Sequence, residues 1–252
     1  MKHLINWKIF FILLGLAMIS IICIFPYIVS VQGELLSQVG QPIEIIFIAQ
    51  FIQSLILFSI IIFLGLLLTK KINFKLPLIQ SIIDNSDYKA VLKKILWKSI
   101  LIGALTAIII YVIDIFFTAQ GGEISTQESY APIWQKLLAS VYGGTTEEIL
   151  MRLFLMSLFI WIGIKLFKQK EPSKIGIIIA IFLSAIIFGL GHLPITASIT
   201  EITPIIVVRA IILNGIGGVV FGWLFWKKGL ESAMIAHFTA DIFLLTLLPL
   251  LF

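Results

Sequence analysis

The sequence predicts an all-α membrane protein, a polytopic bundle of about seven transmembrane helices with one interfacial amphipathic helix. Of its 252 residues, 60% are hydrophobic and only 12% are charged, whereas a soluble domain carries about a quarter charged residues. The apolar residues gather in seven runs, and a membrane-spanning helix needs about 20 such residues. This composition excludes a soluble domain. The net charge of +5 comes from lysines in short loops, which does not indicate a nucleic-acid partner.

The runs follow one another along the whole chain. The first follows two lysines, as in a signal peptide, but its apolar core is too long for one, so we expect a retained helix. Segment 75–95 mixes apolar and charged residues at near-helical spacing, which predicts the amphipathic helix. Segment 121–132 is the clearest polar loop. The seven runs lie at 8–31, 43–69, 96–117, 134–166, 174–192, 204–226 and 230–250.

Every second connection between the runs is basic. Lysines precede the first run and fill the connections at 70–95, 165–174 and 227–228, while the alternate connections carry only acidic charge. Positively charged loops remain in the cytoplasm. The pattern therefore predicts a multi-pass protein of the cell membrane with a cytoplasmic N-terminus and an external C-terminus.

Glu147, Glu148 and Arg152 lie well inside the run at 134–166, where charge is costly and indicates a functional site by default. In the stretch EEILMR, Glu148 and Arg152 share one helix face, and Glu147 is turned by about 100° from Glu148. We predict that Glu148 pairs with Arg152 as a support, which leaves Glu147 free as a base. The alternative is an ion pair that only orients helices. Asp114 and Arg209 lie near helix ends and are expected to snorkel to the interface.

Two later runs carry histidines. The stretch FGLGH places Phe188 four residues before His192, and HFTAD places His237 four residues before Asp241. A carboxylate at that spacing can accept a hydrogen bond from the imidazole and fix its tautomer. Between them, NGIGGVVFG places Asn214 on a face of small residues, where it would link packed helices.

These groups lie at unequal predicted depths. His237 is about 10 Å from the cytoplasmic end of its run at 1.5 Å per residue, and His192 is nearer the outer end. We therefore expect helix tilt, a shifted helix boundary or a kink at Gly143–Gly144. Those glycines could also admit a substrate backbone or simply allow close packing.

The polar groups on three helices can meet only inside the bundle. A glutamate near an imidazole can take a proton from water, and a second imidazole can stabilise the oxyanion formed when that water attacks a carbonyl. Alternatively, the cofactor is one zinc ion, held by His192, His237 and a carboxylate of Glu147 or Asp241. The residues themselves leave both possibilities open.

The ordered motifs EExxxR, FxxxH and HxxxD resemble those of the CAAX-protease and bacteriocin-processing family, also called the Abi family. The resemblance covers about 134–248. It implies a catalytic helix bundle at 131–252, preceded by membrane helices and the amphipathic connection at 1–130. It also implies an intramembrane endopeptidase acting on a membrane-associated peptide or protein. Peptide maturation, bacteriocin-type self-immunity or regulatory proteolysis are the implied roles, and the bilayer and this substrate are the implied partners.

The resemblance implies a role for each matched residue. Glu147 and His192 would activate water, and His237 with Asp241 would stabilise the tetrahedral intermediate. An ionised Asp cannot donate a hydrogen bond, so Asp241 is protonated, orients His237 or ligates a metal. Glu148, Arg152, Phe188 and Asn214 would support the site.

Two other hypotheses for the function are a non-catalytic membrane scaffold that keeps the fold, and a small transporter, which would show repeat symmetry.

Overall fold

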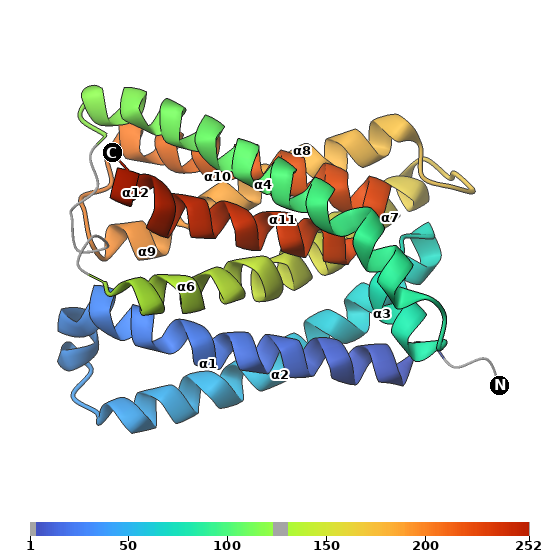
Figure 1. Ribbon diagram of the computed structural model, residues 1–252, viewed down its shortest axis with the longest axis horizontal. Helices are drawn as coiled ribbons and strands as arrows, with labels where there is room; N and C mark the ends of the chain where they lie inside the picture. Colours follow the sequence, from blue (N-terminus) through green and yellow to red (C-terminus); the bar gives the residue numbers. More distant parts are fainter. Residues whose placement is uncertain (1–3, 123–130, 252) are drawn as a thin grey trace.

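The computed structural model describes residues 4–122 and 131–251, and all regular elements in these ranges are helical. Seven helices are long and apolar enough to cross a membrane, and they run side by side along the long axis of the molecule (Figure 1). The predicted all-α bundle is confirmed, and the chain is a multi-pass membrane protein. The spans are α1 (Trp7–Gln38), α2 (Ile43–Ile72), α4 (Tyr88–Ala119), Ile133–Leu166, Lys174–Ala197, α10 (Pro204–Lys228) and Leu230–Leu251.

Three of these spans are composite. The fourth contains α6 (Ile133–Tyr142), the π-helical segments η1 (Gly143–Glu147) and η2 (Ile149–Met156), and α7 (Ser157–Leu166). The fifth joins α8 (Lys174–Gly191) to the short α9 (Leu193–Ala197), which has Pro194 in its first turn. The seventh joins α11 (Leu230–Ile242), the π-helical η3 (Phe243–Leu247) and α12 (Leu248–Leu251). Every site residue predicted from sequence, apart from Asn214 on α10, lies on one of these three spans.

The connection predicted as one amphipathic helix at 75–95 is divided. It contains α3 (Pro77–Ile83), and its last part already belongs to α4. Asn85 takes a left-handed backbone conformation with φ of 51°, and the Asp87 side chain accepts from the Ala90 amide at 3.0 Å. Asn tolerates this conformation and Asp caps new helices, so the turn ends one helix and starts the next. Of the predicted polar loop at 121–132, residues 123–130 lie outside the described ranges.

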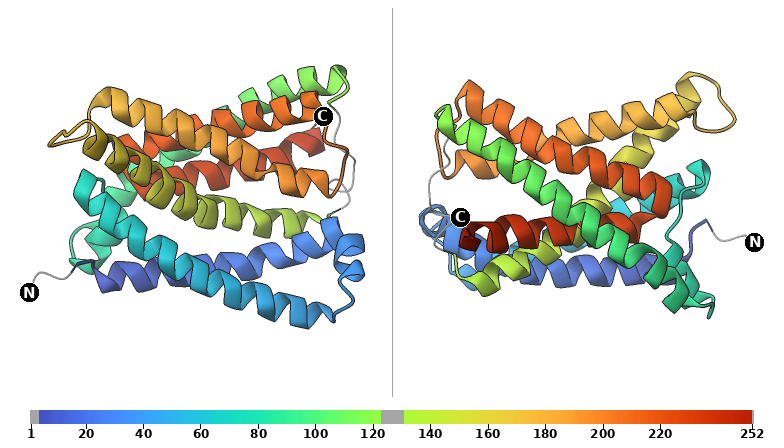
Figure 2. Two further views of the ribbon diagram at one scale, coloured as in Figure 1. Left: turned by 180° about the vertical axis from the view of Figure 1, so that it is seen from behind. Right: turned by 45° about the horizontal axis from the view of Figure 1, so that its top comes forward.

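The basic connections lie at one end of the bundle. The described chain starts there, and the α2–α4 connection, the α7–α8 turn and the α10–α11 corner lie at the same end, while the C-terminus lies at the other (Figures 1 and 2). We call this the lysine-rich end. The arrangement agrees with the predicted alternation of charge. The cytoplasmic assignment of this end stays a prediction.

Small residues allow α8 and α10 to pack closely. A Cβ added to Gly218 would lie 2.7 Å from the Ala185 Cβ, and one added to Gly189 would lie 2.6 Å from the Ile211 Cα. The predicted small-residue face on 214–222 is therefore a packing face. Asn214 itself donates to the Ala210 carbonyl of its own helix at 2.9 Å, so its hydrogen bond is not the expected link between helices.

The first helices pack directly on the segment that carries the glutamates. α1 contacts α6 and η1, and α2 contacts η2. The hydroxyls of Ser20 on α1 and Thr146 on η1 are hydrogen-bonded to each other, and both residues are fully buried. One hydrophobic cluster contains residues from α1 through α12. The boundary at 130/131 between two units stays a prediction.

Asp114 and Arg209 do not snorkel separately, because they pair with each other. Arg209 Nε and Nη2 donate to the two Asp114 carboxylate oxygens at 2.6 and 2.8 Å. The Asp114 side chain is 30% exposed and the Arg209 side chain is 17% exposed. Since α4 packs on α10, two opposite charges that look isolated in sequence neutralise each other at this contact.

Candidate active site

The glutamate motif lies on a π-helical stretch, a form that is rare and frequent at functional sites. Just after this stretch, the Ser157 hydroxyl donates to the Arg152 carbonyl five residues earlier, at 3.1 Å. Two glycines allow α11 to approach this stretch. A Cβ on Gly144 would lie 2.9 Å from the Met234 carbonyl oxygen and 3.0 Å from the Phe238 nitrogen. The expected irregularity at Gly143–Gly144 is therefore a change of helix type at a close helix contact.

Glu148 is the centre of the buried part of the site. Its Oε2 lies 3.2 Å from Arg152 Nε, and its Oε1 lies 2.8 Å from His237 Nδ1. Glu148 is 0% exposed and Arg152 is 1% exposed. The Glu148–Arg152 pair expected from the spacing is present. The carboxylate also accepts from His237, and that second contact joins the residue between η1 and η2 to α11.

Two aromatic rings enclose the guanidinium and the imidazole. The Arg152 guanidinium carbon lies 5.2 Å from the Phe188 ring centre and 5.6 Å from that of Phe221. The Phe221 ring stacks on His237 with centroids 4.6 Å apart and an interplanar angle of 22°. Phe221 was missed by the sequence reasoning. The one local feature that could have indicated it is Gly217, one turn earlier on the same helix. A Cβ at Gly217 would lie 3.1 Å from the Phe221 ring, so the glycine leaves room for that ring.

The other edge of His237 faces two carboxylates. Its Nε2 lies 3.5 Å from Asp241 Oδ1 and 3.7 Å from Glu147 Oε2. Glu147 is 22% exposed and Asp241 is 20% exposed, whereas the His237 side chain is 7% exposed. The group that orients the imidazole through a hydrogen bond is Glu148. Asp241, at 3.5 Å, is beyond good hydrogen-bond distance. Glu147 and Asp241 thus form the accessible side of the cluster.

His192 approaches this cluster from α8. Its Nδ1 lies 2.8 Å from the Phe188 carbonyl oxygen. A carbonyl only accepts, so Nδ1 carries the proton and Nε2 has a free lone pair. The Phe188 ring is edge-on to His192 at 4.8 Å and to His237 at 5.8 Å between ring centres. Phe188 therefore links the two imidazoles, although within 4–122 and 131–251 no hydrogen bond or ion pair joins them.

Tilted helices reconcile the unequal depths expected for the two histidines. α8 crosses the bundle obliquely (Figure 2), so the end of α8 comes near the middle of α11. The site therefore combines Glu147, Glu148 and Arg152 with His237, Asp241 and Phe188, and has His192 at its margin.

The arrangement does not fit the zinc hypothesis. Among the described residues, no group of three or more His, Cys, Asp or Glu side chains is arranged to hold a metal ion. Within the described ranges, His192 approaches His237 only across the Phe188 ring, which is edge-on to both imidazoles, and no hydrogen bond or ion pair joins His192 to Glu147 or Asp241. We therefore derive no step through a metal.

Carboxylates and imidazoles that face one another inside a transmembrane bundle are groups suited to acid–base chemistry, and ionisable side chains in such a position indicate a functional site in a membrane protein. A family model described as "Rce1-like: Type II CAAX prenyl endopeptidase Rce1-like" matches residues 129–243. That part of the chain is a domain of this family, and it carries all the residues of the candidate site. The match supports an intramembrane endopeptidase in general terms. Comparison with curated proteins and with solved structures gives no match.

Gly143 and Gly144 provide a test of the site's geometry. A Cβ on Gly143 would collide with the Asp241 carboxylate, a side-chain end that can move, whereas one on Gly144 would meet the backbone of α11. We expect Gly143→Ala to fold normally and to lose peptidase activity by about tenfold or more, because a displacement of about 1 Å is costly in catalysis. Gly144→Ala should lower the free energy of unfolding, since α11 must shift.

The comparison requires denaturant titration and an activity assay on both variants. Gly163→Ala is the matched control, because nothing lies within 4 Å of a Cβ at that position. Unchanged activity in folded Gly143→Ala would show that the position of Asp241 does not matter for turnover.

Proposed function

We propose that the protein hydrolyses a peptide bond in a membrane-associated peptide or protein, using water activated by Glu147 and His192. The single observation that carries the proposal is the setting of His237. Its Nδ1 lies 2.8 Å from buried Glu148, and its Nε2 faces two accessible carboxylates. This setting leaves one imidazole nitrogen directed at the place where a substrate carbonyl can approach.

The proposed reaction starts at the accessible carboxylate. Glu147 takes a proton from a water molecule, and the free lone pair of His192 Nε2 accepts its second hydrogen as a hydrogen bond. The hydroxide attacks the substrate carbonyl carbon, and the carbonyl oxygen becomes an oxyanion. When the carbon–nitrogen bond breaks, Glu147 returns its proton to the leaving amine. The products are a new carboxyl terminus and a new amine.

The oxyanion needs hydrogen-bond donors. His237 in its doubly protonated form donates through Nδ1 to Glu148 and through Nε2 to the oxyanion. Asp241 can contribute only in its protonated form, because an ionised carboxylate has no proton to donate. Arg152 takes no part in the reaction, and its role is to balance the charge of Glu148 so that the carboxylate remains fixed against His237.

The test is cleavage of membrane-associated peptides by the purified protein in lipid, with water enriched in oxygen-18. We expect new carboxyl termini that carry one heavy oxygen per cleavage, and no such products with His237→Ala. Folding of the variant is checked by denaturant titration. If His237→Ala cleaves as fast as the unchanged protein, the proposed role of His237 fails. If the unchanged protein cleaves no peptide at all, the proposed hydrolysis fails and a non-catalytic scaffold is favoured.

The same cleavage assay in the presence of a chelator tests whether hydrolysis proceeds without a metal ion. We expect the cleavage rate to stay the same after treatment with a chelator, because the described side chains form no group suited to a metal ion. Loss of cleavage that only zinc restores would contradict the proposed activation of water by side chains alone.

A further inference from the structure

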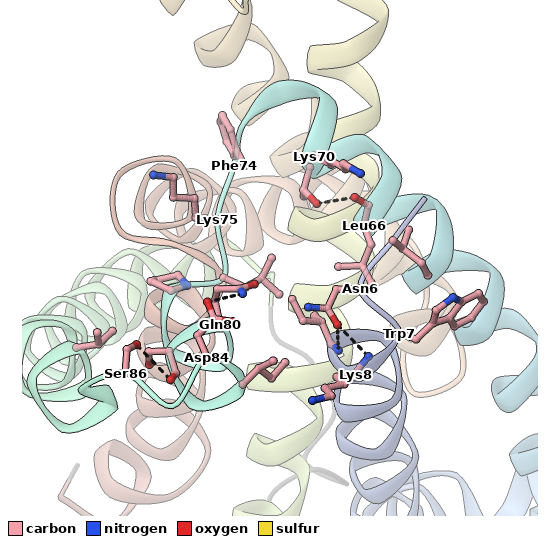
Figure 3. A pocket seen from close by; sticks show the side chains of 18 residues that line it. Asn6, Trp7, Lys8, Leu66, Lys70, Phe74, Lys75, Gln80, Asp84 and Ser86 are labelled. Atoms are coloured by element: carbon pink, nitrogen blue, oxygen red, sulfur yellow. Dashed lines mark hydrogen bonds between the residues drawn. The ribbon is translucent and has the colours of Figure 1, made fainter. Parts of the chain in front are cut away.

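A cavity of about 1080 Å³ lies at the lysine-rich end, separate from the candidate active site. It is bounded by the start of α1, the end of α2, α3 and the start of α4. Lys8, Lys70 and Lys75 reach it from three different segments of the chain (Figure 3). None of the motifs shared with the endopeptidase family contributes to its lining.

The lining has two chemical characters. The lining contains three lysines and one carboxylate, Asp84, and that carboxylate already accepts from Gln80 Nε2 at 2.8 Å. The walls are mostly apolar and include Leu66, Phe74 and Leu76, with Ile5, Ile83 and Val91. A positively charged rim over apolar walls is complementary to an anionic amphiphile, whose phosphate meets the lysines and whose methylenes meet the walls.

The cavity lies at the ends of helices, and this position indicates that the anionic amphiphile is a membrane lipid. α1 begins at Trp7, α2 ends at Ile72 and α4 begins at Tyr88, so the cavity lies at the ends of three candidate membrane spans. Trp7 is 49% exposed and lines the cavity, and tryptophan is enriched at the level of lipid headgroups. We propose that this cavity binds the headgroup of an anionic phospholipid from the adjacent leaflet.

The same cavity is connected to the helix that carries His237. Pro77, Gln80 and Ser81 of α3 line it. α3 is fixed to the start of α11 by Glu231, which is 5% exposed and whose Oε1 accepts from the Ile79 amide at 2.8 Å. Gly229 has φ of 100° and lies against Pro77, where a side chain would not fit. A bound lipid thus stabilises α3 against α11.

The test measures binding of short-chain phosphatidylglycerol to the purified protein by native mass spectrometry and titration. We expect saturable binding of one molecule and no comparable binding of short-chain phosphatidylcholine. Lys8→Gln combined with Lys75→Gln should lower the affinity by about tenfold or more, since each lysine attracts the anionic headgroup. Lys70 is left unchanged because it donates to the Leu4 carbonyl.

The matched control is Lys170→Gln combined with Lys174→Gln, which removes the same charge from the α7–α8 turn at the same end. We expect this control to bind normally. Equal loss in both double variants would show diffuse attraction and overturn the site, as would equal binding of phosphatidylcholine. Competition by inorganic phosphate as strong as that by phosphatidylglycerol would identify a phosphate site and overturn the lipid.

Amide hydrogen exchange gives a second readout that does not depend on peptidase activity. Bound phosphatidylglycerol should slow exchange of the Ile79 amide, which is hydrogen-bonded to Glu231, and should not do so in the Lys8→Gln, Lys75→Gln variant. Binding without any change at Ile79 would contradict the contact between the bound lipid and α3.

Discussion

Glu147→Gln is expected to reduce peptide hydrolysis by at least about 100-fold, because a general base contributes about 10²- to 10⁴-fold to such reactions. Glutamine has nearly the same shape and can still accept a hydrogen bond, but it cannot take a proton from water at neutral pH. Glu147 is 22% exposed and makes no hydrogen bond within the described part of the chain, so its replacement should leave the fold intact. The measurement is the initial rate of peptide cleavage in lipid.

Glu34→Gln is the matched control for this substitution. Glu34 lies exposed near the end of α1, so the control removes the same charge far from the candidate site. We expect it to cleave at the unchanged rate. A Glu147→Gln protein that retained cleavage within a few-fold would show that another group activates the water.

Arg152→Met is expected to lower the free energy of unfolding by about 3–5 kcal/mol, the usual cost of removing one partner of a buried ion pair. Glu148 is 0% exposed, and the substitution leaves its carboxylate without the guanidinium at 3.2 Å. Methionine keeps much of the side-chain volume and packs well against aromatic rings such as Phe188 and Phe221. The main loss is therefore charge compensation, which denaturant titration in mixed micelles will measure.

The double variant Glu148→Gln, Arg152→Met separates charge from packing. It leaves no uncompensated charge, and the glutamine oxygen can still accept from His237 Nδ1. We expect it to recover most of the stability that the single variant loses. A double variant as unstable as Arg152→Met would show that packing of the arginine, rather than its charge, stabilises this region.

Hydrophobicity alone predicted the number and limits of the spans. The run at 43–69 became α2 (Ile43–Ile72), and the run at 134–166 became the span Ile133–Leu166. Such runs predict helices because the backbone polar groups of a segment inside a bilayer must form hydrogen bonds within that segment, which an α-helix provides. The break between α3 and α4 was missed, although the residues DNSD at 84–87 are typical of a turn followed by a helix cap.

The candidate site was predictable only where its members are near one another in sequence. The spacing of Glu148 and Arg152 predicted their contact, which a helix makes by itself. It did not predict that Glu148 and Glu147 face opposite nitrogens of His237, because that depends on how α11 packs against a π-helical stretch. Phe221, the Ser20–Thr146 hydrogen bond and the Asp114–Arg209 pair were missed for the same reason, since each joins residues far apart in the chain.

The amino-acid sequence by itself determined that this protein is a bundle of membrane helices with an acidic and histidine-containing motif set, because apolar length and short-range spacing are local properties. The tertiary structure decided which imidazole nitrogen faces which carboxylate, which aromatic rings enclose Arg152, and where a lysine-lined cavity forms at the lysine-rich end. These are contacts between helices, and their geometry follows from close packing around glycines such as Gly144 and Gly218. A Cβ at either position would separate helices that now touch. The spacing of residues along one helix does not predict which other helix will contact its glycines.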